Sequence, residues 1–137
     1  MKVLITGGAG FIGSHLAEYH LAKGDTVTAV DDLSTGSTDV FKGFKPERFT
    51  FVEGDILTWK DLDREVKRAD RIYHMAAVVG IVRVLREPVE VTRVNVLGTE
   101  RLLESVVRSH HLPELVIASS SSVYGHSRQE APVSYTH

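Results

Sequence analysis

Met1-Lys-Val-Leu-Ile-Thr-Gly-Gly-Ala-Gly-Phe-Ile-Gly-Ser14 is the stretch of this 137-residue chain that decides its fold. The apolar residues 3–5 predict a buried strand, which enters a glycine-rich turn before a helical pattern begins. Gly7 permits the tight turn, Gly10 lets a ligand approach the backbone, and Gly13 lets the helix pack closely on the strand. Because a helix N-terminus offers unpaired N–H groups and a positive dipole end, the stretch predicts a binding site for a dinucleotide pyrophosphate.

Composition and charge are those of an ordinary globular domain. The chain is 42% hydrophobic and carries 16 basic against 18 acidic residues, so it lacks the basic excess expected of a nucleic-acid-binding protein. It contains no cysteine, which excludes disulfides and thiolate metal sites. No apolar run reaches transmembrane length, and the N-terminus does not have the layout of a signal peptide. We therefore expect a cytoplasmic protein that binds neither nucleic acid nor membrane.

Strand-like and helical segments alternate along the rest of the chain. Strands are expected at residues 26–30, 49–52, 71–75 and 115–118, and helices at 11–23, 61–68 and 89–109. Residues 33–46 and 125–137 are predicted to be loops, and residues 78–86 are ambiguous between helix and irregular loop. The alternation predicts an open parallel sheet with helices on both faces, and no linker divides the chain into two domains.

Side-chain periodicity adds detail to two of these helices. The apolar face of the first is predicted to contain Phe11, Ile12, His15, Leu16, Tyr19 and Leu21. Gly24 is expected to cap its C-terminus. Gly98 interrupts the last helix, where it costs roughly 1 kcal/mol relative to Ala unless close packing requires it.

An acidic residue stands where a dinucleotide-binding fold needs one. Asp31 and Asp32 end the second strand, and Asp31 follows Gly13 by 18 positions (31 − 13), close to the spacing of about 20 residues typical of the ribose-binding acid. A carboxylate there accepts hydrogen bonds from ribose hydroxyls and repels a 2′-phosphate, which favours NAD over NADP. The alternatives are a polar turn at the two aspartates and, for the glycines alone, a tight turn with helix packing.

Further candidates follow the later strands, at the edge where open α/β sheets bind ligands. Asp55 is a candidate adenine contact, with a turn residue after Gly54 as the alternative. Ala76 and Ala77 leave room for a cofactor, although close packing explains them almost as well. Asn95 stands in a helix where its propensity is poor, so we expect it to bridge backbone groups near the site; the alternative is an Asn facing solvent.

The serines and histidines give no independent catalytic or metal site. Residues 119–122 are four serines after the last strand, but no G-x-S-x-G turn makes one of them a hydrolase nucleophile. The seven histidines include the adjacent pair His110 and His111, whose side chains point in different directions on a helix. We interpret this pair as a solvated helix end and predict no metal site.

Six short motifs together resemble the extended short-chain dehydrogenase/reductase family, in particular its NAD-dependent nucleotide-sugar epimerases and dehydratases. They run the length of the chain in the family's order: Thr6-Gly-Gly-Ala-Gly-Phe-Ile-Gly-Ser-His-Leu16, Asp31-Asp-Leu-Ser-Thr-Gly36, Gly54-Asp-Ile56, His74-Met-Ala-Ala77, Asn95-Val-Leu-Gly-Thr99 and Ser119-Ser-Ser-Ser-Val-Tyr-Gly125. Each motif alone is modest evidence, whereas the ordered set is specific. The resemblance implies a Rossmann-type doubly wound parallel sheet of about five strands that binds NAD.

The resemblance also implies the roles of individual residues. Those that would hold NAD are Gly7, Gly10, Phe11, Ile12 and Gly13 at the pyrophosphate, Asp31, Asp32, Ser34, Thr35 and Gly36 at the adenosine ribose, Asp55 and Ile56 at the adenine, Met75, Ala76 and Ala77 along the middle of the cofactor, and Asn95 as a buried polar helper. Ser120 matches the family's catalytic Ser/Thr. Tyr124 belongs to the serine motif and is not the catalytic tyrosine.

The catalytic base that the family uses falls outside the 137 residues. It is the Tyr of a Tyr-x-x-x-Lys motif whose expected position lies past His137, and Tyr135 comes too early. The resemblance also leads us to expect that the family's sixth parallel strand and C-terminal substrate domain are absent from these residues. We therefore expect residues 1–137 to be an incomplete NAD-binding Rossmann domain, able to bind NAD but lacking the general base for turnover.

Two hypotheses of different classes remain. One is the N-terminal NAD-binding part of an enzyme with a nucleotide-sugar substrate; the other is a non-catalytic NAD-binding or sensing module that is complete at this length. An uncovered sheet edge and an apolar helix face predict self-association, and the helix over 89–109 resembles one that pairs in family homodimers. The residues leave open the sugar and the choice among epimerisation, dehydration and decarboxylation.

Overall fold

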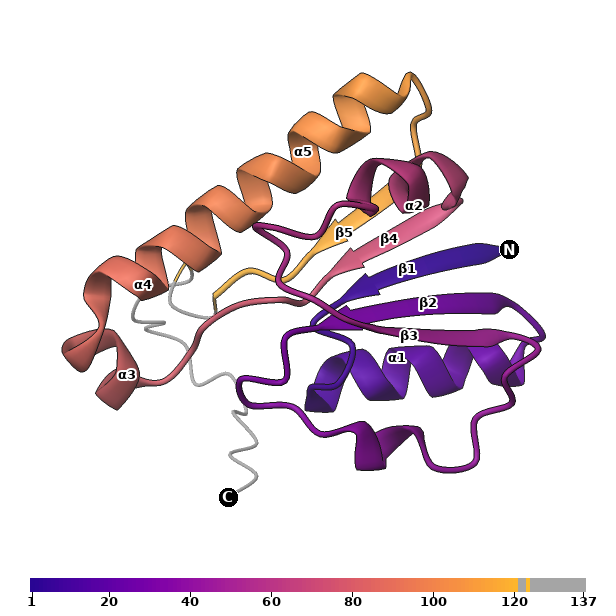
Figure 1. The fold of residues 1–137 in the computed structure, drawn as a ribbon, viewed down its shortest axis with the longest axis horizontal. Helices are drawn as coiled ribbons and strands as arrows, with labels where there is room; N and C mark the ends of the chain where they lie inside the picture. The colour runs from indigo at the N-terminus through magenta and orange to yellow at the C-terminus, as the bar shows by residue number, and fades with distance from the viewer. Residues whose placement is uncertain (121–122, 124–137) are drawn as a thin grey trace, which may run out of the picture.

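The computed structural model describes residues 1–120 and 123. Within them it confirms the α/β class, with a parallel sheet of five strands in the order β3-β2-β1-β4-β5 (Figure 1). The strands are β1 (Lys2–Thr6), β2 (Thr26–Asp31), β3 (Phe49–Glu53), β4 (Arg71–His74) and β5 (Glu114–Ile117). The helices are α1 (Phe11–Ala22), α2 (Leu62–Arg68), α3 (Ile81–Arg86), α4 (Pro88–Thr92) and α5 (Gly98–Ser109), with a 3-10 turn η1 (Thr38–Phe41) and a π turn η2 (Arg93–Leu97).

Helices cover both faces of the sheet, as the alternation predicted (Figure 1). Val3 and Ile5 of β1 pack with Ala17 on the face that α1 covers. Leu4, between them in sequence, packs with Leu102 on the face that α2 and α5 cover. Since successive side chains of a strand point to opposite faces, the apolar β1 contributes to both layers of the core.

The buried face of α1 differs from the predicted one. Its buried residues are Gly13, Ser14, Ala17 and His20, whereas Phe11 and Tyr19 are 81% and 52% exposed. A Cβ at Gly13 would collide with the carbonyl oxygen of Gly7, so the start of the helix lies too close to the glycine loop for any side chain at this position. The prediction was therefore wrong for the exposed Phe11, Ile12, His15 and Tyr19, whereas the half-buried Leu16 and Leu21 pack against the core on this face, as predicted.

The segment predicted as one helix over 89–109 consists of α4, η2 and α5 in direct succession (Figure 1). Pro88 stands in its first turn, as expected. A Cβ at Gly98 would lie 3.0 Å from Cγ2 of Ile56, so close packing explains this glycine. Asn95 lies in η2, where the π turn widens the helix.

The remaining predictions differ in outcome. Residues 81–86 of the ambiguous segment form α3, and the predicted loop over 33–46 contains η1. Gly24 has φ 84° and follows the last turn of α1, as expected of a helix C-cap. The predicted loop over 125–137 lies outside the described residues. No helix in the part of the chain that the structure describes is long and apolar enough to cross a membrane.

Candidate nucleotide-binding site

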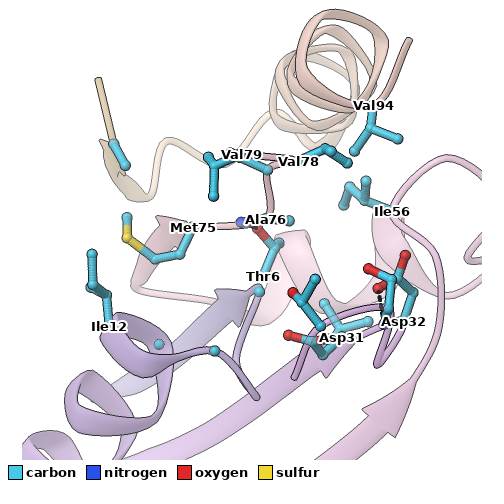
Figure 2. Close-up of a pocket in the computed structure, with 18 of the residues that line it drawn as sticks. Thr6, Ile12, Asp31, Asp32, Ile56, Met75, Ala76, Val78, Val79 and Val94 are labelled. Atoms are coloured by element: carbon cyan, nitrogen blue, oxygen red, sulfur yellow. Dashed lines mark hydrogen bonds between the residues drawn. The ribbon is translucent and has the colours of Figure 1, made fainter. Parts of the chain in front are cut away.

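A pocket of about 360 Å³ opens at the carboxyl ends of β1, β2 and β4 (Figure 2). The chain reaches β4 from β3 by passing to the other side of β1, and such a reversal of strand order is where open α/β sheets bind ligands. The predicted residues that line the pocket are Gly7, Gly10, Ile12, Gly13, Asp31, Asp32, Ser34, Thr35, Asp55, Ile56, Met75, Ala76 and Ala77. Lining residues that were not predicted are Thr6, Val30, Gly54, Val78, Val79, Val94, Ala118 and Ser119.

The three glycines of the loop are required for different reasons. Gly7 has φ 69°, and a Cβ there would lie 2.6 Å from the amide nitrogen of Ala76. Gly13 is required by the contact between α1 and the loop described above. A Cβ at Gly10 would meet only the carbonyl oxygen of Gly7, at 3.4 Å, which is an ordinary contact. The chain's own packing thus requires Gly7 and Gly13, whereas Gly10 leaves space on the side of the pocket.

The N-terminus of α1 faces this pocket without a side-chain cap. Gly10 is its N-cap residue, and its first turn contains no acidic residue. By contrast, η1 is capped by Ser37, whose Oγ accepts a hydrogen bond from the Asp39 amide at 3.2 Å. The Phe11 side chain lies outside the pocket and packs against His15, so any role of Phe11 in the pocket would fall to its backbone. Uncapped N–H groups and the positive end of the helix dipole suit a phosphate.

Carboxylates form the opposite side of the pocket. Asp31 Oδ2 accepts a hydrogen bond from the amide of Ala9 at 2.9 Å, and Asp31 Oδ1 accepts one from the amide of Leu33, also at 2.9 Å. Each oxygen keeps a further lone pair for a ligand hydroxyl. Figure 2 shows Asp31 and Asp32 at one end of the pocket and Ile12 with Met75 at the other. Gly36 does not line the pocket, but a Cβ there would lie 2.8 Å from that of Ala9, so it supports the loop from outside.

The side chains of Asp55 and Asn95 form hydrogen bonds with backbone groups at the pocket. Asp55 Oδ1 accepts a hydrogen bond from the amide of Leu57 at 2.8 Å, so the turn alternative accounts for one of its oxygens. Asn95 does not line the pocket but holds Val78, which does. Its Oδ1 accepts from the Val78 amide at 2.7 Å, and its Nδ2 donates to the Val78 carbonyl at 2.9 Å. Asn95 therefore bridges backbone groups, as expected, and the solvent-facing alternative is wrong.

The serine motif reaches the pocket through Ser119 rather than through Ser120. Ser119 lines the pocket with Ala118, whereas the next residue, Ser120, is exposed and is not among the lining residues. The catalytic role predicted for Ser120 stays a prediction, and Tyr124 and Tyr135 lie outside the described residues.

One Tyr-x-x-x-Lys sequence that was not predicted as a site does occur in the chain. It is Tyr19-His-Leu-Ala-Lys23, in the last turns of α1. Lys23 Nζ lies 4.3 Å from the ring centroid of Tyr19, and neither residue lines the pocket. Because α1 starts at the pocket and runs toward the opposite edge of the sheet, this pair is on the wrong side for catalysis there (Figure 1).

The histidine pair fits the predicted helix end. His110 follows α5 with φ 53°, in the left-handed conformation that ends many helices. His111 Nε2 donates to the carbonyl of Ala69 at 2.9 Å. Across residues 1–120 and 123, no three His, Asp or Glu side chains gather in a way that could hold a metal ion.

Known proteins are similar to this chain in sequence and in fold. UDP-glucose 4-epimerase of Erwinia amylovora is 38% identical over 141 residues, covering 98% of this chain and 40% of that protein. UDP-glucuronic acid decarboxylase 2 of Arabidopsis thaliana is 34% identical, covering 97% and 28%. The crystal structure of Thermus thermophilus UDP-glucose 4-epimerase in complex with NAD is 35% identical with a TM-score of 0.76, covering 88% and 38%. The chain thus spans at most two fifths of these relatives. Since the family model described as the NAD dependent epimerase/dehydratase family matches residues 3–137, the chain belongs to that family.

Proposed function

We propose that the pocket binds NAD and that the chain is the NAD-binding part of a nucleotide-sugar epimerase or dehydratase, with UDP-glucose 4-epimerase as the leading example. One observation carries this proposal: the uncapped N-terminus of α1 and the Asp31 carboxylate line the same pocket, at the reversal of strand order. The first suits a pyrophosphate and the second a ribose, and their pairing in one pocket suits a dinucleotide. The family membership supports the same interpretation.

The residues present fit the parts of NAD. The N–H groups at the start of α1 would bind the pyrophosphate, and Gly10 leaves space for it to approach. Asp31 would accept from the adenosine ribose, with Asp32, Ser34 and Thr35 along that end. The adenine would lie beside Asp55 and Ile56. The small Ala76 and Ala77, with Met75, would border the middle of the cofactor.

The charges around the pocket favour NAD over NADP. Its lining includes Asp31, Asp32 and Asp55 but, among the residues that the structure describes, no lysine or arginine. A 2′-phosphate would therefore meet carboxylates and find no cation to pair with.

When bound, NAD supplies a carbon centre that accepts a hydride from a sugar and returns it. This chain's residues would bind and orient the cofactor, and Ser120 would hydrogen-bond the reacting oxygen of a nucleotide sugar. The base that takes the sugar's proton is not identified among these residues, so we propose that the chain alone binds NAD without turning over substrate. A homodimer and a cytoplasmic location, both expected from the sequence, are part of this proposal.

Calorimetry with NAD and with NADP tests the proposal. We expect NAD to bind at least about tenfold more tightly, a difference of about 1.4 kcal/mol. Trp59, the single tryptophan, packs beside the pocket-lining Gly54, so its fluorescence provides a second readout. No binding of NAD would overturn the proposal, and equal affinities would remove the role given to Asp31. The mass of the native polypeptide separates the enzyme from the non-catalytic module: a longer product favours the first.

A further inference from the structure

A continuous chain of hydrogen bonds runs beneath one wall of the pocket. Thr6 Oγ1 lies 2.7 Å from His74 Nδ1, and His74 Nε2 lies 3.0 Å from Thr99 Oγ1. The Ala76 amide donates to Thr6 Oγ1 at 3.3 Å, and Thr99 Oγ1 donates to the Asn95 carbonyl at 2.8 Å. His74 is only 4% exposed. The imidazole therefore joins β1, at Thr6, to the start of α5, at Thr99.

The chemistry of these groups fixes the direction of every bond. The Thr99 hydroxyl gives its proton to the Asn95 carbonyl, which only accepts, so His74 Nε2 must carry a hydrogen and donate it to Thr99 Oγ1. Burial lowers the pKa of His74 from its usual 6.5, so the ring is neutral at neutral pH. A neutral imidazole has one N–H, so Nδ1 accepts from the Thr6 hydroxyl. The Thr6 oxygen in turn accepts from the Ala76 amide.

The two ends of this series of hydrogen bonds reach the same wall of the pocket. At one end is the amide of Ala76, and at the other is Asn95, whose side chain holds the backbone of Val78. Ala76 and Val78 both line the pocket, and Figure 2 shows Thr6 directly against Ala76 with Val78 beyond it. A Cβ at Gly7 would lie 2.6 Å from the Ala76 nitrogen, so the wall also touches the glycine loop, and a small shift of one displaces the other.

We propose that His74, held as the neutral Nε2–H tautomer, is a positioning residue for the dinucleotide pocket. Through Thr6 and Thr99 it fixes the wall formed by residues 76–78 against the glycine loop on one side and η2 on the other. The role in dinucleotide binding rests on the proposed function, whereas the tautomer and the direction of the bonds do not.

Two variants at Thr99 form a matched pair for testing this role. Thr99→Val keeps the shape of the side chain but leaves His74 Nε2–H without an acceptor and removes the donor to Asn95. Thr99→Ser keeps the hydroxyl. We expect Thr99→Val to weaken NAD binding about tenfold, since a buried unsatisfied donor is costly, and Thr99→Ser to bind within about twofold of the wild type. Circular dichroism and thermal unfolding verify that both variants fold.

Nitrogen NMR of the histidine side chains gives a readout that packing alone does not move. With His74 assigned by comparison with His74→Gln, we expect Nε2 protonated and Nδ1 unprotonated in the wild type, and a mixture of tautomers in Thr99→Val. An Nδ1–H or doubly protonated ring in the wild type at neutral pH would overturn the proposal, as would equal NAD affinity of Thr99→Val and the wild type. Failure of the wild type to bind NAD would instead overturn the proposed function, and the NMR result would still decide the tautomer.

Discussion

Asp31 at the end of β2 accepts a hydrogen bond from the backbone N–H of Ala9 in the glycine loop, at 2.9 Å. Its second oxygen accepts from the amide of Leu33. One carboxylate therefore holds the loop on one side and the chain that leaves β2 on the other. The acid proposed to bind the ribose also shapes the loop proposed to bind the pyrophosphate, so its substitution should affect more than one contact.

Asp31→Asn removes the charge but keeps one acceptor oxygen. We expect NAD affinity to fall about tenfold, because charge-assisted hydrogen bonds are the stronger ones. NADP affinity should fall less or should rise, because a 2′-phosphate no longer meets this negative charge. Calorimetry with both cofactors measures the ratio. Asp39→Asn, which breaks only an exposed pair with Lys42 at 3.0 Å, should bind as the wild type does. If the ratio of the NAD and NADP affinities is the same in Asp31→Asn and the wild type, the charge of Asp31 does not cause the preference for NAD.

The strand–helix order could be predicted from the sequence because its signals are local. The run at residues 26–30 is rich in β-branched residues, and it forms β2. Gly24 and Pro88 mark helix ends where they were expected. The buried face of α1 could be predicted only in part in this way, at Leu16 and Leu21. Hydrophobicity favours Phe11 and Tyr19, whereas the distance between α1 and the glycine loop selects Gly13 and its small neighbours.

Most of the lining of the pocket could be predicted because the resemblance names residues at strand ends, and parallel strands end at one edge. The hydrogen bonds that join Thr6, His74 and Thr99 behind the pocket wall could not be predicted. Thr6 and His74 are 68 positions apart, and His74 and Thr99 are 25 apart, so neither periodicity nor spacing indicates their contact. In the sequence His74 is only the first residue of a motif. Its contact with Thr6 follows from the pairing of β1 with β4, which brings the two residues opposite each other.

Alanine at two glycines should separate folding from binding. Gly13→Ala places a methyl group against the Gly7 carbonyl oxygen, and we expect it to destabilise the fold by about 1–3 kcal/mol. Gly10 has φ −78° and ψ 171°, a conformation open to alanine, so Gly10→Ala should lower stability by no more than about 1 kcal/mol. It should nevertheless weaken NAD binding at least about tenfold, because its methyl group fills the space left for the phosphates.

Thermal unfolding and calorimetry measure the two effects for both variants. Gly43 has φ 93°, and a Cβ added there would meet nothing within 4 Å. It offers a third variant, Gly43→Ala, in which backbone strain alone lowers stability. If Gly10→Ala binds NAD as tightly as the wild type, the pyrophosphate does not approach α1 at Gly10.

The free energy of unfolding should decrease as the pH falls, over a pH range set by the pKa of His74. Burial lowers the pKa of His74 below 6.5 in the folded chain, so the unfolded chain takes up this proton first. The contribution of His74 to the free energy of unfolding is complete above about pH 6.5. It is lost as the pH falls toward the lower pKa of His74 in the folded chain, and the free energy of unfolding then decreases by at most about 1.4 kcal/mol per pH unit. Urea unfolding between about pH 5 and 8 measures the slope.

Two variants separate His74 from the other titrating groups. His74→Gln should lose this part of the slope, while His15→Gln, at an exposed position, should keep it. The hydrogen bond from His20 lowers the pKa of Asp25 below 3.8, so Asp25 stabilises the fold above that pH and loses its effect only in stronger acid. A wild-type slope that persists in His74→Gln would show that another group titrates in this window.

An apolar stripe on the outer face of α5 and the preceding turn is the surface through which we expect the chain to self-associate. Val96, Leu103 and Val107 are all exposed, Val107 by 73%, and they line one shallow hollow. Their spacing places them on one side of the helix. Contiguous exposed apolar surface of this kind favours association, because association removes it from water.

Sedimentation velocity of the wild type should therefore show a dimer or larger species, and Leu103→Glu with Val107→Glu should shift it to monomer. The new carboxylates would stand beside Glu100 and Glu104 in the same hollow, so a second copy would have to bury like charges. Val40→Glu, on the exposed η1, adds one of the same charges away from the stripe and should leave the association unchanged. Because the stripe lies outside the lining of the cofactor pocket, the double variant should keep its affinity for NAD. A monomeric wild type would contradict the expectation. An associated double variant would place the contact on another surface, such as β5, the last strand of the sheet that the structure describes.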